Sequence, residues 1–243
     1  MNYDNHYRPS GFNFLPPITK NIIVINVILF VLTILLQNAQ HIDLNRYLGL
    51  HHHLAEDFKP HQFITYLFMH GSLSHLFFNM FGVFIFGQVL ENTWGPKRYL
   101  IFYILTGLGA ALTQYVINHF EITKFLTALN QELASQELTT EEQAYYINLK
   151  YEYLNNRYII GASGSLFGLL GAFGMLFPNR LLYLYFFIPV KAKWLVIGYG
   201  LIELFSGISN NPADNVAHFA HLGGLFVGII IVLIWRRDRN HFY

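Results

Sequence analysis

Apolar residues cluster in long stretches along this chain, and short polar segments separate the stretches. The first stretch, residues 22–36 (IIVINVILFVLTILL), follows Lys20 and approaches the roughly 20 apolar residues that a helix needs to cross a bilayer. Further stretches lie at residues 74–91, 98–118, 161–177, 192–208 and 216–235. The pattern predicts six membrane-spanning helices and an all-α, polytopic membrane protein.

Basic residues are distributed unevenly over the segments between these spans. With a cytoplasmic N-terminus, most of the 15 lysines and arginines lie on the cytoplasmic side, as the positive-inside rule expects. This predicts that both termini are cytoplasmic, with a tail (residues 1–19), a six-span domain (20–236) and a second tail (237–243). The cytoplasmic set is Arg8, Lys20, Lys97, Arg98, Arg180, Lys191, Lys193, Arg236, Arg237 and Arg239, and the outer set is Arg46, Lys59, Lys124, Lys150 and Arg157.

Two outer segments are long, residues 37–70 and residues 119–157. The second is charged, and Thr139 followed by Glu142 has the spacing of a capping box ahead of AYYINLKYEYL. A capping box marks the start of a helix, so we expect a solvated helical insertion between the third and fourth spans.

Composition also favours a membrane protein. Hydrophobic residues make up 53% of the chain and charged residues only 12%, about half the share usual in soluble domains. A net charge of +1 argues against nucleic-acid binding, and the absence of cysteine excludes disulfides and thiolate metal sites. Residues 1–19 lack both the apolar core of a signal peptide and the Arg-rich character of a mitochondrial targeting segment. We therefore expect an uncleaved first span and a bacterial-type plasma membrane.

Polar side chains inside spans are costly, and their positions are informative. His75 and Asn79 lie four residues apart near the start of the second span, hence on one face of a helix. Both can donate hydrogen bonds toward a common point. The alternative is that the pair only ties helices together.

The fourth span begins GASGSLFG, which places Ser163 beside a glycine face formed by Gly164 and Gly168. Glycines at this spacing allow two helices to approach closely. From Gly164 to Phe177 the apolar run is too short to cross the bilayer, so we expect Ser163 below the outer surface, at a helix N-terminus.

The sixth span carries a second glycine face, Gly224 and Gly228, with His221 one turn earlier. If the two glycine faces pack together, Ser163 and His221 come within reach of each other. A serine becomes a nucleophile beside a base, and a neutral imidazole with a pKa near 6.5 is a suitable base. His218 is the competing candidate, and its place relative to the sixth-span motif given below favours a supporting role.

Two glutamates also lie in spans. Glu91 ends the second span and suits a structural tie to backbone or to Arg98, and Glu203 in the fifth span is expected to be a buried structural residue.

The motifs in this order resemble those of the rhomboid intramembrane serine proteases. The resemblance covers residues 60–235, nearly all of the membrane domain. It implies a six-helix rhomboid-like bundle in which Ser163 is the nucleophile and His221 the general base. The matching pieces are HLFFN in the second span, Gly87, Glu91 and Gly95 at its end, GASG in the fourth span and AHLGGLFVG in the sixth.

The resemblance also implies several finer features. The catalytic pair is a dyad without an acidic third member, and His75, Asn79 and a backbone N–H near Ser163 stabilise the oxyanion. Residues 209–216 and the fifth span form a mobile cover through which a substrate helix enters. The expected function is a serine endopeptidase that cuts the transmembrane segments of single-span membrane proteins in the lipid bilayer. No cofactor, metal or nucleic-acid partner is expected.

Three alternatives stay open at this point. The first is a non-catalytic protein of the same fold that binds or escorts transmembrane clients. The second is a transporter. The third is a metal or haem protein, although no HExxH motif occurs. Its candidate ligands are His51, His52, His53, His70, His75, His218 and His221.

Overall fold

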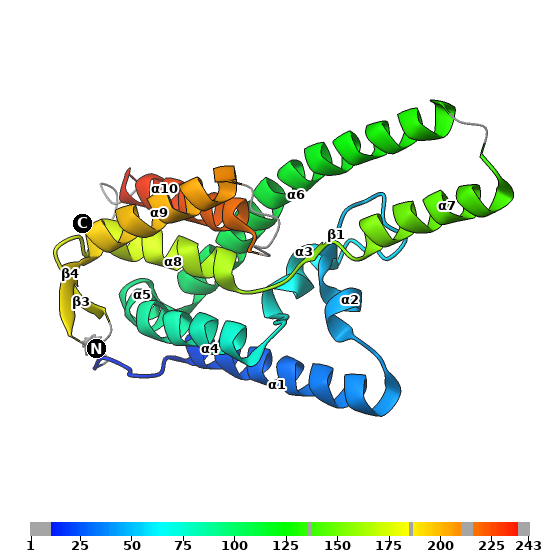
Figure 1. The fold of residues 1–243 in the computed structure, drawn as a ribbon. Coiled ribbons are helices and arrows are strands. Elements are labelled where there is room, and N and C mark those ends of the chain that lie inside the picture. The colour runs from blue at the N-terminus through cyan, green and yellow to red at the C-terminus, as the bar shows by residue number, and fades with distance from the viewer. Residues whose placement is uncertain (1–10, 136–137, 185–186, 210–215, 238–243) are drawn as a thin grey trace, which may run out of the picture.

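A computed structural model describes residues 11–135, 138–184, 187–209 and 216–237 (Figure 1). Most of the loop in the expected cover, residues 210–215, lies outside the described residues, as do parts of both tails, residues 1–10 and 238–243. The helices are α1 (Pro17–Gln40), α2 (Leu44–Leu48), α3 (Gln62–Thr65), α4 (Leu73–Gly82), α5 (Gln88–Trp94), α6 (Pro96–Ser135), α7 (Thr140–Asn155), α8 (Ser163–Leu176), α9 (Ala192–Ser209) and α10 (His218–Arg237).

The polytopic helical fold predicted from the sequence is confirmed. Four helical runs among the described residues are long and apolar enough to span a membrane: Pro17–Gln40, Leu73–Trp94, Pro96–Ser135 and His218–Arg237. The helix α8 is apolar but has only 14 residues, and α9 coincides with the predicted fifth span. The count of six spans stays a prediction for these two helices.

The second span is not a uniform α-helix. A short π-helical stretch, η2 (Val83–Gly87), separates α4 from α5. Glu91 in α5 is 2% exposed and accepts hydrogen bonds from the backbone N–H groups of Ile18 and Thr19, at 2.9 and 2.7 Å. These N–H groups begin α1, where a carboxylate is favoured by the helix dipole. The expected tie from Glu91 to backbone is thus present, and its partner is α1.

The predicted third span, residues 98–118, is the first part of a longer helix. The third span continues without a break as α6, a helix of 40 residues that leaves the body of the molecule. No proline or glycine interrupts residues 110–135, so the helix persists where its surroundings change from apolar to polar.

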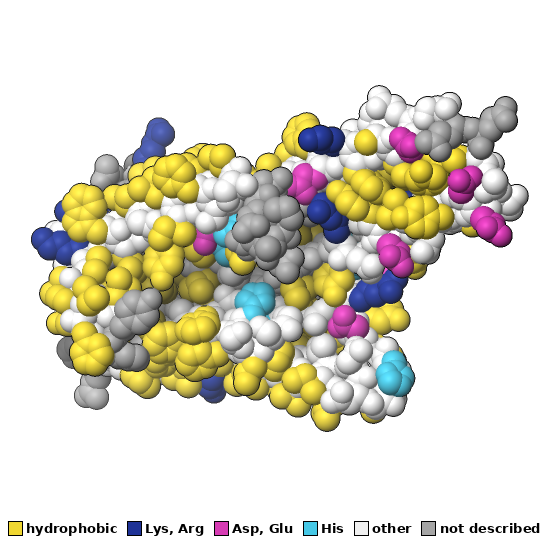
Figure 2. Space-filling view, in the orientation of Figure 1, with side chains coloured by type: hydrophobic (Ala, Val, Ile, Leu, Met, Phe, Trp, Pro, Cys, Tyr) yellow, Lys and Arg dark blue, Asp and Glu magenta, His cyan; other side chains and the backbone are white. Residues whose placement is uncertain are grey.

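The outer part of α6 pairs with α7 to form an arm, residues 119–155 (Figure 1). The rings of Phe125 and Tyr153 stack at 3.6 Å, and Arg157 pairs with Glu121 at 3.0 Å. Thr139 and Glu142 form the expected capping box at the start of α7. The prediction that this insertion is helical is confirmed. Figure 2 shows acidic side chains gathered on the arm, whereas hydrophobic side chains cover much of the body.

Two small antiparallel sheets were not predicted. In one, β3 (Leu181–Leu184) pairs with β4 (Ile188–Lys191) between α8 and α9. In the other, β1 (Leu50–His51) pairs with β2 (Tyr158–Ile159), with Leu50 opposite Ile159. The second sheet fixes the chain immediately before α8, because the N–H of Gly161 then donates to the carbonyl of Tyr66 at 2.9 Å.

The predicted packing of the two glycine faces is confirmed. A Cβ atom placed on Gly224 would collide with the carbonyl oxygen of Gly164, and one on Gly228 would lie 2.8 Å from the carbonyl oxygen of Gly168. The backbones of α8 and α10 therefore touch directly. On the other side, Gly168 faces Thr106 of α6, so α8 is held between α6 and α10.

Replacing Gly224 with alanine is expected to destabilise the protein by about 1–3 kcal/mol, because the added methyl group overpacks the interior and meets rigid backbone. Thermal unfolding in detergent would measure the effect. Gly198→Ala is the matched control, since a Cβ there has nothing within 4 Å. Alanine in that helix should be neutral or stabilising. Equal melting temperatures for the two variants would contradict the close contact.

Candidate functional site

Ser163 is the first residue of α8, and His221 lies in the first turn of α10. The Nε2 atom of His221 is 2.8 Å from the Oγ atom of Ser163, within hydrogen-bond distance. His221 is only 8% exposed. The contact follows from the glycine packing just described, because Gly164 and Gly224 bring the two helix ends together.

Phe167 holds the imidazole of His221 in place. It lies one turn after Ser163 in α8, and its ring stacks on the imidazole with a centroid distance of 4.4 Å and an interplanar angle of 5°. A stacked ring limits rotation of the imidazole and excludes water from one of its faces. The base and the serine are therefore positioned by the same helix.

Glu203, expected to be a buried structural residue, is buried and lies against both histidines of α10. This glutamate of α9 is 8% exposed, and its Oε2 atom lies 2.9 Å from Nδ1 of His221 and 2.6 Å from Nδ1 of His218. Nδ1 of His221 forms no hydrogen bond with Glu203, so this contact is electrostatic. The resemblance implied no acidic third member, yet a carboxylate faces the far side of the imidazole. His218 is directed to Glu203, in keeping with a supporting role.

His75 lies beside the serine. Gly161 has a φ of +122°, and a Cβ there would come 2.8 Å from Nε2 of His75 and 3.7 Å from Oγ of Ser163. Glycine is thus required at this position by both conformation and space. The first N–H groups of an α-helix have no acceptor within it, so those at the start of α8 are available as donors beside Ser163.

Asn79 is 3% exposed and pairs with a residue that sequence analysis had not placed in the site. Its Nδ2 atom lies 3.1 Å from Nε2 of His70, which is itself 1% exposed. The rings of His70 and His75 are 4.9 Å apart. The structure therefore brings His75 and Asn79 together with His70, on the approach to α8.

Burial, and secondly the neighbouring His75, lower the pKa of His70 to about 3. The folded protein keeps this imidazole neutral, whereas the unfolded chain protonates it below about pH 6.5. The contribution of the neutral His70 to the free energy of unfolding is fully present above pH 6.5. It falls with the pH below that value, by up to about 1.4 kcal/mol per pH unit.

We expect His70→Gln, which keeps an acceptor for Asn79, to lose less stability than wild type between pH 6.5 and pH 4.5. Melting temperatures across this range would test it. His61→Gln, an exposed histidine, serves as the control and should follow wild type. Parallel curves for His70→Gln and wild type would contradict a neutral buried His70.

Two groups of side chains among the described residues have three potential metal ligands within 4.8 Å of one another. One consists of Glu203, His218 and His221, and its atoms belong to the site just described. The other consists of His52, His53 and His119, outside the predicted spans. His51 does not join them, because its ring nitrogens contact the carbonyls of Gly49 and Asn155.

Comparison with known proteins agrees with the motifs. A family model described as the Rhomboid domain matches residues 57–238. RHOMBOID-like protein 12, mitochondrial, of Arabidopsis thaliana is 30% identical over 183 residues, which cover 74% of this chain and 47% of the relative. The chain spans about half the length of this and other plant relatives it matches.

Two bacterial relatives carry the word protease in their names. The Rhomboid protease AarA of Providencia stuartii is 25% identical over 177 residues, covering 70% of this chain and 53% of the relative. The putative rhomboid protease YdcA of Bacillus subtilis is 24% identical over 182 residues, covering 73% and 69%. With the family model matching most of its length, this chain belongs to the rhomboid family, a family of helical membrane proteins that includes intramembrane proteases.

Proposed function

We propose that the protein is an intramembrane serine endopeptidase in which Ser163 is the nucleophile and His221 the general base. The 2.8 Å approach of His221 Nε2 to Ser163 Oγ carries the proposal, because an activated serine requires an adjacent base. The names of the bacterial relatives support it.

In the proposed reaction, Nε2 of His221 takes the hydroxyl proton as Oγ of Ser163 attacks the scissile carbonyl carbon. His221 then gives this proton to the leaving amine, and the acyl group stays on Ser163. A water molecule, deprotonated by His221, hydrolyses the ester and restores the serine. Glu203 favours the tautomer with the proton on Nδ1, which leaves Nε2 free to accept.

The developing oxyanion needs hydrogen-bond donors in place before the reaction. We assign this role to His75, Asn79 and an N–H at the start of α8. His70 orients the amide of Asn79, since it accepts from Nδ2. Each donor of this kind is typically worth about 2.7–4 kcal/mol of transition-state stabilisation.

The proposed substrates are single-span membrane proteins whose transmembrane helix opens near the outer end of α8. A peptide bond inside a helix is hydrogen-bonded and covered, so helix-weakening glycine or proline near the cut should favour cleavage. The apolar side chains exposed on α9, among them Ile202 and Phe205 at 59% and 68%, offer such a helix an apolar surface.

A fluorophosphonate probe tests the nucleophile without knowledge of the substrate. The reagent phosphonylates a serine that a neighbouring base activates, and peptide mass spectrometry locates the modified residue. We expect modification of Ser163 in wild type and none in His221→Ala. An unmodified Ser163 in folded wild type would favour a non-catalytic protein that binds or escorts transmembrane clients.

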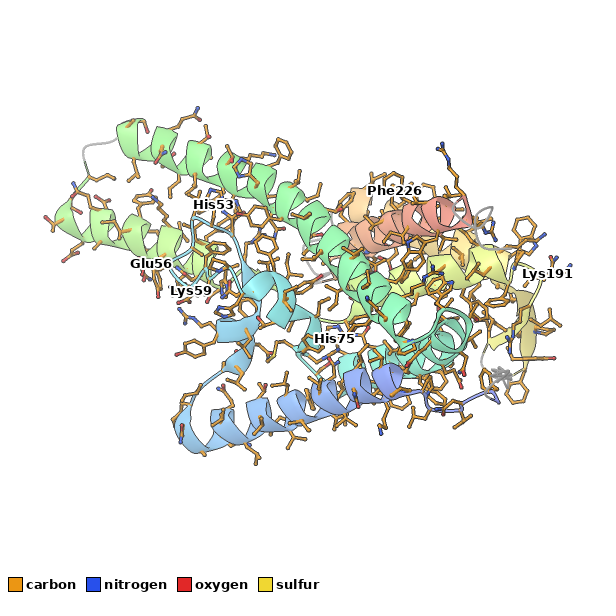
Figure 3. The ribbon with its side chains drawn as sticks, turned by 180° about the vertical axis from the view of Figure 1, so that it is seen from behind. His53, Glu56, Lys59, His75, Lys191 and Phe226 are labelled. Atoms are coloured by element: carbon orange, nitrogen blue, oxygen red, sulfur yellow. The ribbon has the colours of Figure 1, made fainter. Side chains whose placement is uncertain are left out.

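We also propose that the protein lies in a bacterial plasma membrane with both termini in the cytoplasm. Basic residues near the ends of spans support this orientation. The chain has no cysteine, so single cysteines at Lys191 and at Glu56 can be labelled from either side with an impermeant maleimide. Figure 3 shows these residues at opposite ends of the molecule. Labelling of Glu56→Cys from outside and Lys191→Cys only after lysis is expected, and the reverse would invert the orientation.

A further inference from the structure

Three histidines that take no part in the proposed reaction converge outside the predicted spans. His52 and His53 follow β1 directly, and His119 belongs to α6. The Nε2 atom of His52 is 3.2 Å from Nδ1 of His119, and the ring centroids of His52 and His53 are 4.1 Å apart. One nitrogen from each ring lies within 4.8 Å of the other two. We name these three residues the outer histidine cluster.

One ring of the cluster is fixed and two can adjust. His52 is 2% exposed and stacks on Tyr115 at 5.1 Å, whereas His53 and His119 are exposed. The hydroxyl of Tyr115 lies 2.6 Å from Nδ1 of His53 and accepts the backbone N–H of that residue at 3.2 Å. The same tyrosine therefore orients two of the three imidazoles.

Within the described ranges, the structure gives no ion pair between the outer histidine cluster and a carboxylate. Protonated imidazoles at this spacing would repel one another, so the arrangement suits neutral rings. One nitrogen of each ring lies within 4.8 Å of the other two, so neutral rings could turn three lone pairs to one metal ion in place of the hydrogen bond between His52 and His119.

We propose that the outer histidine cluster binds a divalent transition-metal ion, with zinc as the preferred occupant. Imidazole nitrogen suits zinc, copper and nickel, whereas magnesium and calcium require oxygen ligands. Zinc holds nitrogens at about 2.0–2.1 Å in a tetrahedron, which places them roughly 3.4 Å apart. The contact between His52 and His119 already has this spacing, and rotation of the exposed His53 completes the set. Water takes the fourth position.

Metal binding requires a change of tautomer at His52. The N–H of Leu54 donates to Nδ1 of His52 at 3.3 Å, so without metal the ring proton is on Nε2 and points to His119. Coordination through Nε2 moves this proton to Nδ1 and replaces the weak contact with Leu54. The hydroxyl of Tyr115 then accepts Nδ1–H of His53, the kind of outer hydrogen bond that orients metal-bound histidines.

The bound ion would join two parts of the chain that are far apart in sequence. It would connect the segment after β1 to α6 at the base of the arm, where Figure 3 shows His53. His75, beside Ser163, lies away from the arm in the same view. The proposed metal ion would therefore cross-link the segment after β1 to α6, and it would be separate from the proposed catalytic residues.

Cobalt spectroscopy on the full chain, purified in detergent without a polyhistidine tag, tests the proposal. Cobalt(II) in a tetrahedral nitrogen site absorbs visible light strongly, and zinc abolishes the signal when it displaces cobalt. The protein should carry His221→Ala, which removes one ligand of the group formed with Glu203 and His218. We expect one cobalt ion per chain and its displacement by zinc.

Single substitutions then locate the ion. His53→Ala and His119→Ala should each weaken zinc binding about 10-fold or more, since even outer-shell changes at metal sites cost about 10–100-fold. Both positions are exposed, so the variants should fold, and unchanged circular dichroism would show it. His61→Ala, an exposed histidine nearby, should bind zinc like the parent protein. Absence of cobalt binding, or equal zinc affinity in all variants, would overturn the proposal.

Discussion

Ser163→Ala is expected to abolish cleavage of a transmembrane substrate, lowering kcat by at least about 10⁴-fold. Without the Oγ atom no acyl-enzyme forms, and the residual rate from the oxyanion donors alone is small. The assay uses purified protein in liposomes and a tagged single-span substrate with glycine in its helix. Gel analysis gives the rate, and mass spectrometry gives the position of the cut.

Ser165→Ala is the matched control for this loss. Ser165 lies two residues further along α8, is fully buried and donates its hydroxyl to the carbonyl of Tyr103 at 2.7 Å. Its removal costs a buried hydrogen bond, about 1 kcal/mol of stability, and should leave kcat near wild type. Cleavage that persists in Ser163→Ala would refute the nucleophile, and loss of activity in both variants would show that packing of α8 is responsible.

Glu203→Gln should lower kcat by roughly 10²-fold to 10⁴-fold while KM changes little. The substitution keeps the shape of the side chain but removes the charge that favours a proton on Nδ1 of His221. A glutamine amide can donate to Nδ1 instead, which would place the ring proton on Nε2, facing Ser163. In that tautomer the histidine cannot accept the serine proton.

Three measurements separate this positioning role from a structural one. The rate of fluorophosphonate modification of Ser163 should fall in parallel with kcat. Glu203→Asp should recover part of the activity. Glu91→Gln makes the same chemical change at another buried glutamate, and it should reduce thermal stability through α1 without lowering kcat. A kcat for Glu203→Gln within about threefold of wild type would show that the carboxylate only supports packing.

The sequence predicts the helices of this fold well because long apolar stretches admit few alternatives in a bilayer. It also predicts the contact between α8 and α10, since Gly164 and Gly224 can be recognised by their spacing. The sequence did not show that the third span and the first part of the insertion form one helix, because a helix that leaves the membrane keeps its conformation until a breaker occurs. The pairing of β1 with β2 involves two residues from each strand, too few to give a periodic pattern.

The neighbours of the site residues were harder to predict. Glu203 and His221 come from different helices, and only the angle at which α9 packs on α10 brings the carboxylate to Nδ1. His70 precedes α4, outside any span, and lacks a motif of its own. His119 is separated from His52 by 67 residues, and no ligand spacing links them. An acidic residue in one predicted span and a histidine in the next could be compared as a possible pair, and this comparison would have identified Glu203 and His221 as candidates.

The contact between α8 and α10 also governs when the site forms during synthesis. Ser163 and His221 are 58 residues apart, and the helix that carries the base is made after every other helix described above. A ribosome-bound chain that has inserted α8 therefore holds a serine without its base. Because helices enter the membrane in order of synthesis, the nascent protein is expected to gain activity only after α10 docks against the glycines of α8. Any activity that needs both residues then begins only when insertion is complete, and the translocation machinery meets the chain before Ser163 has its base.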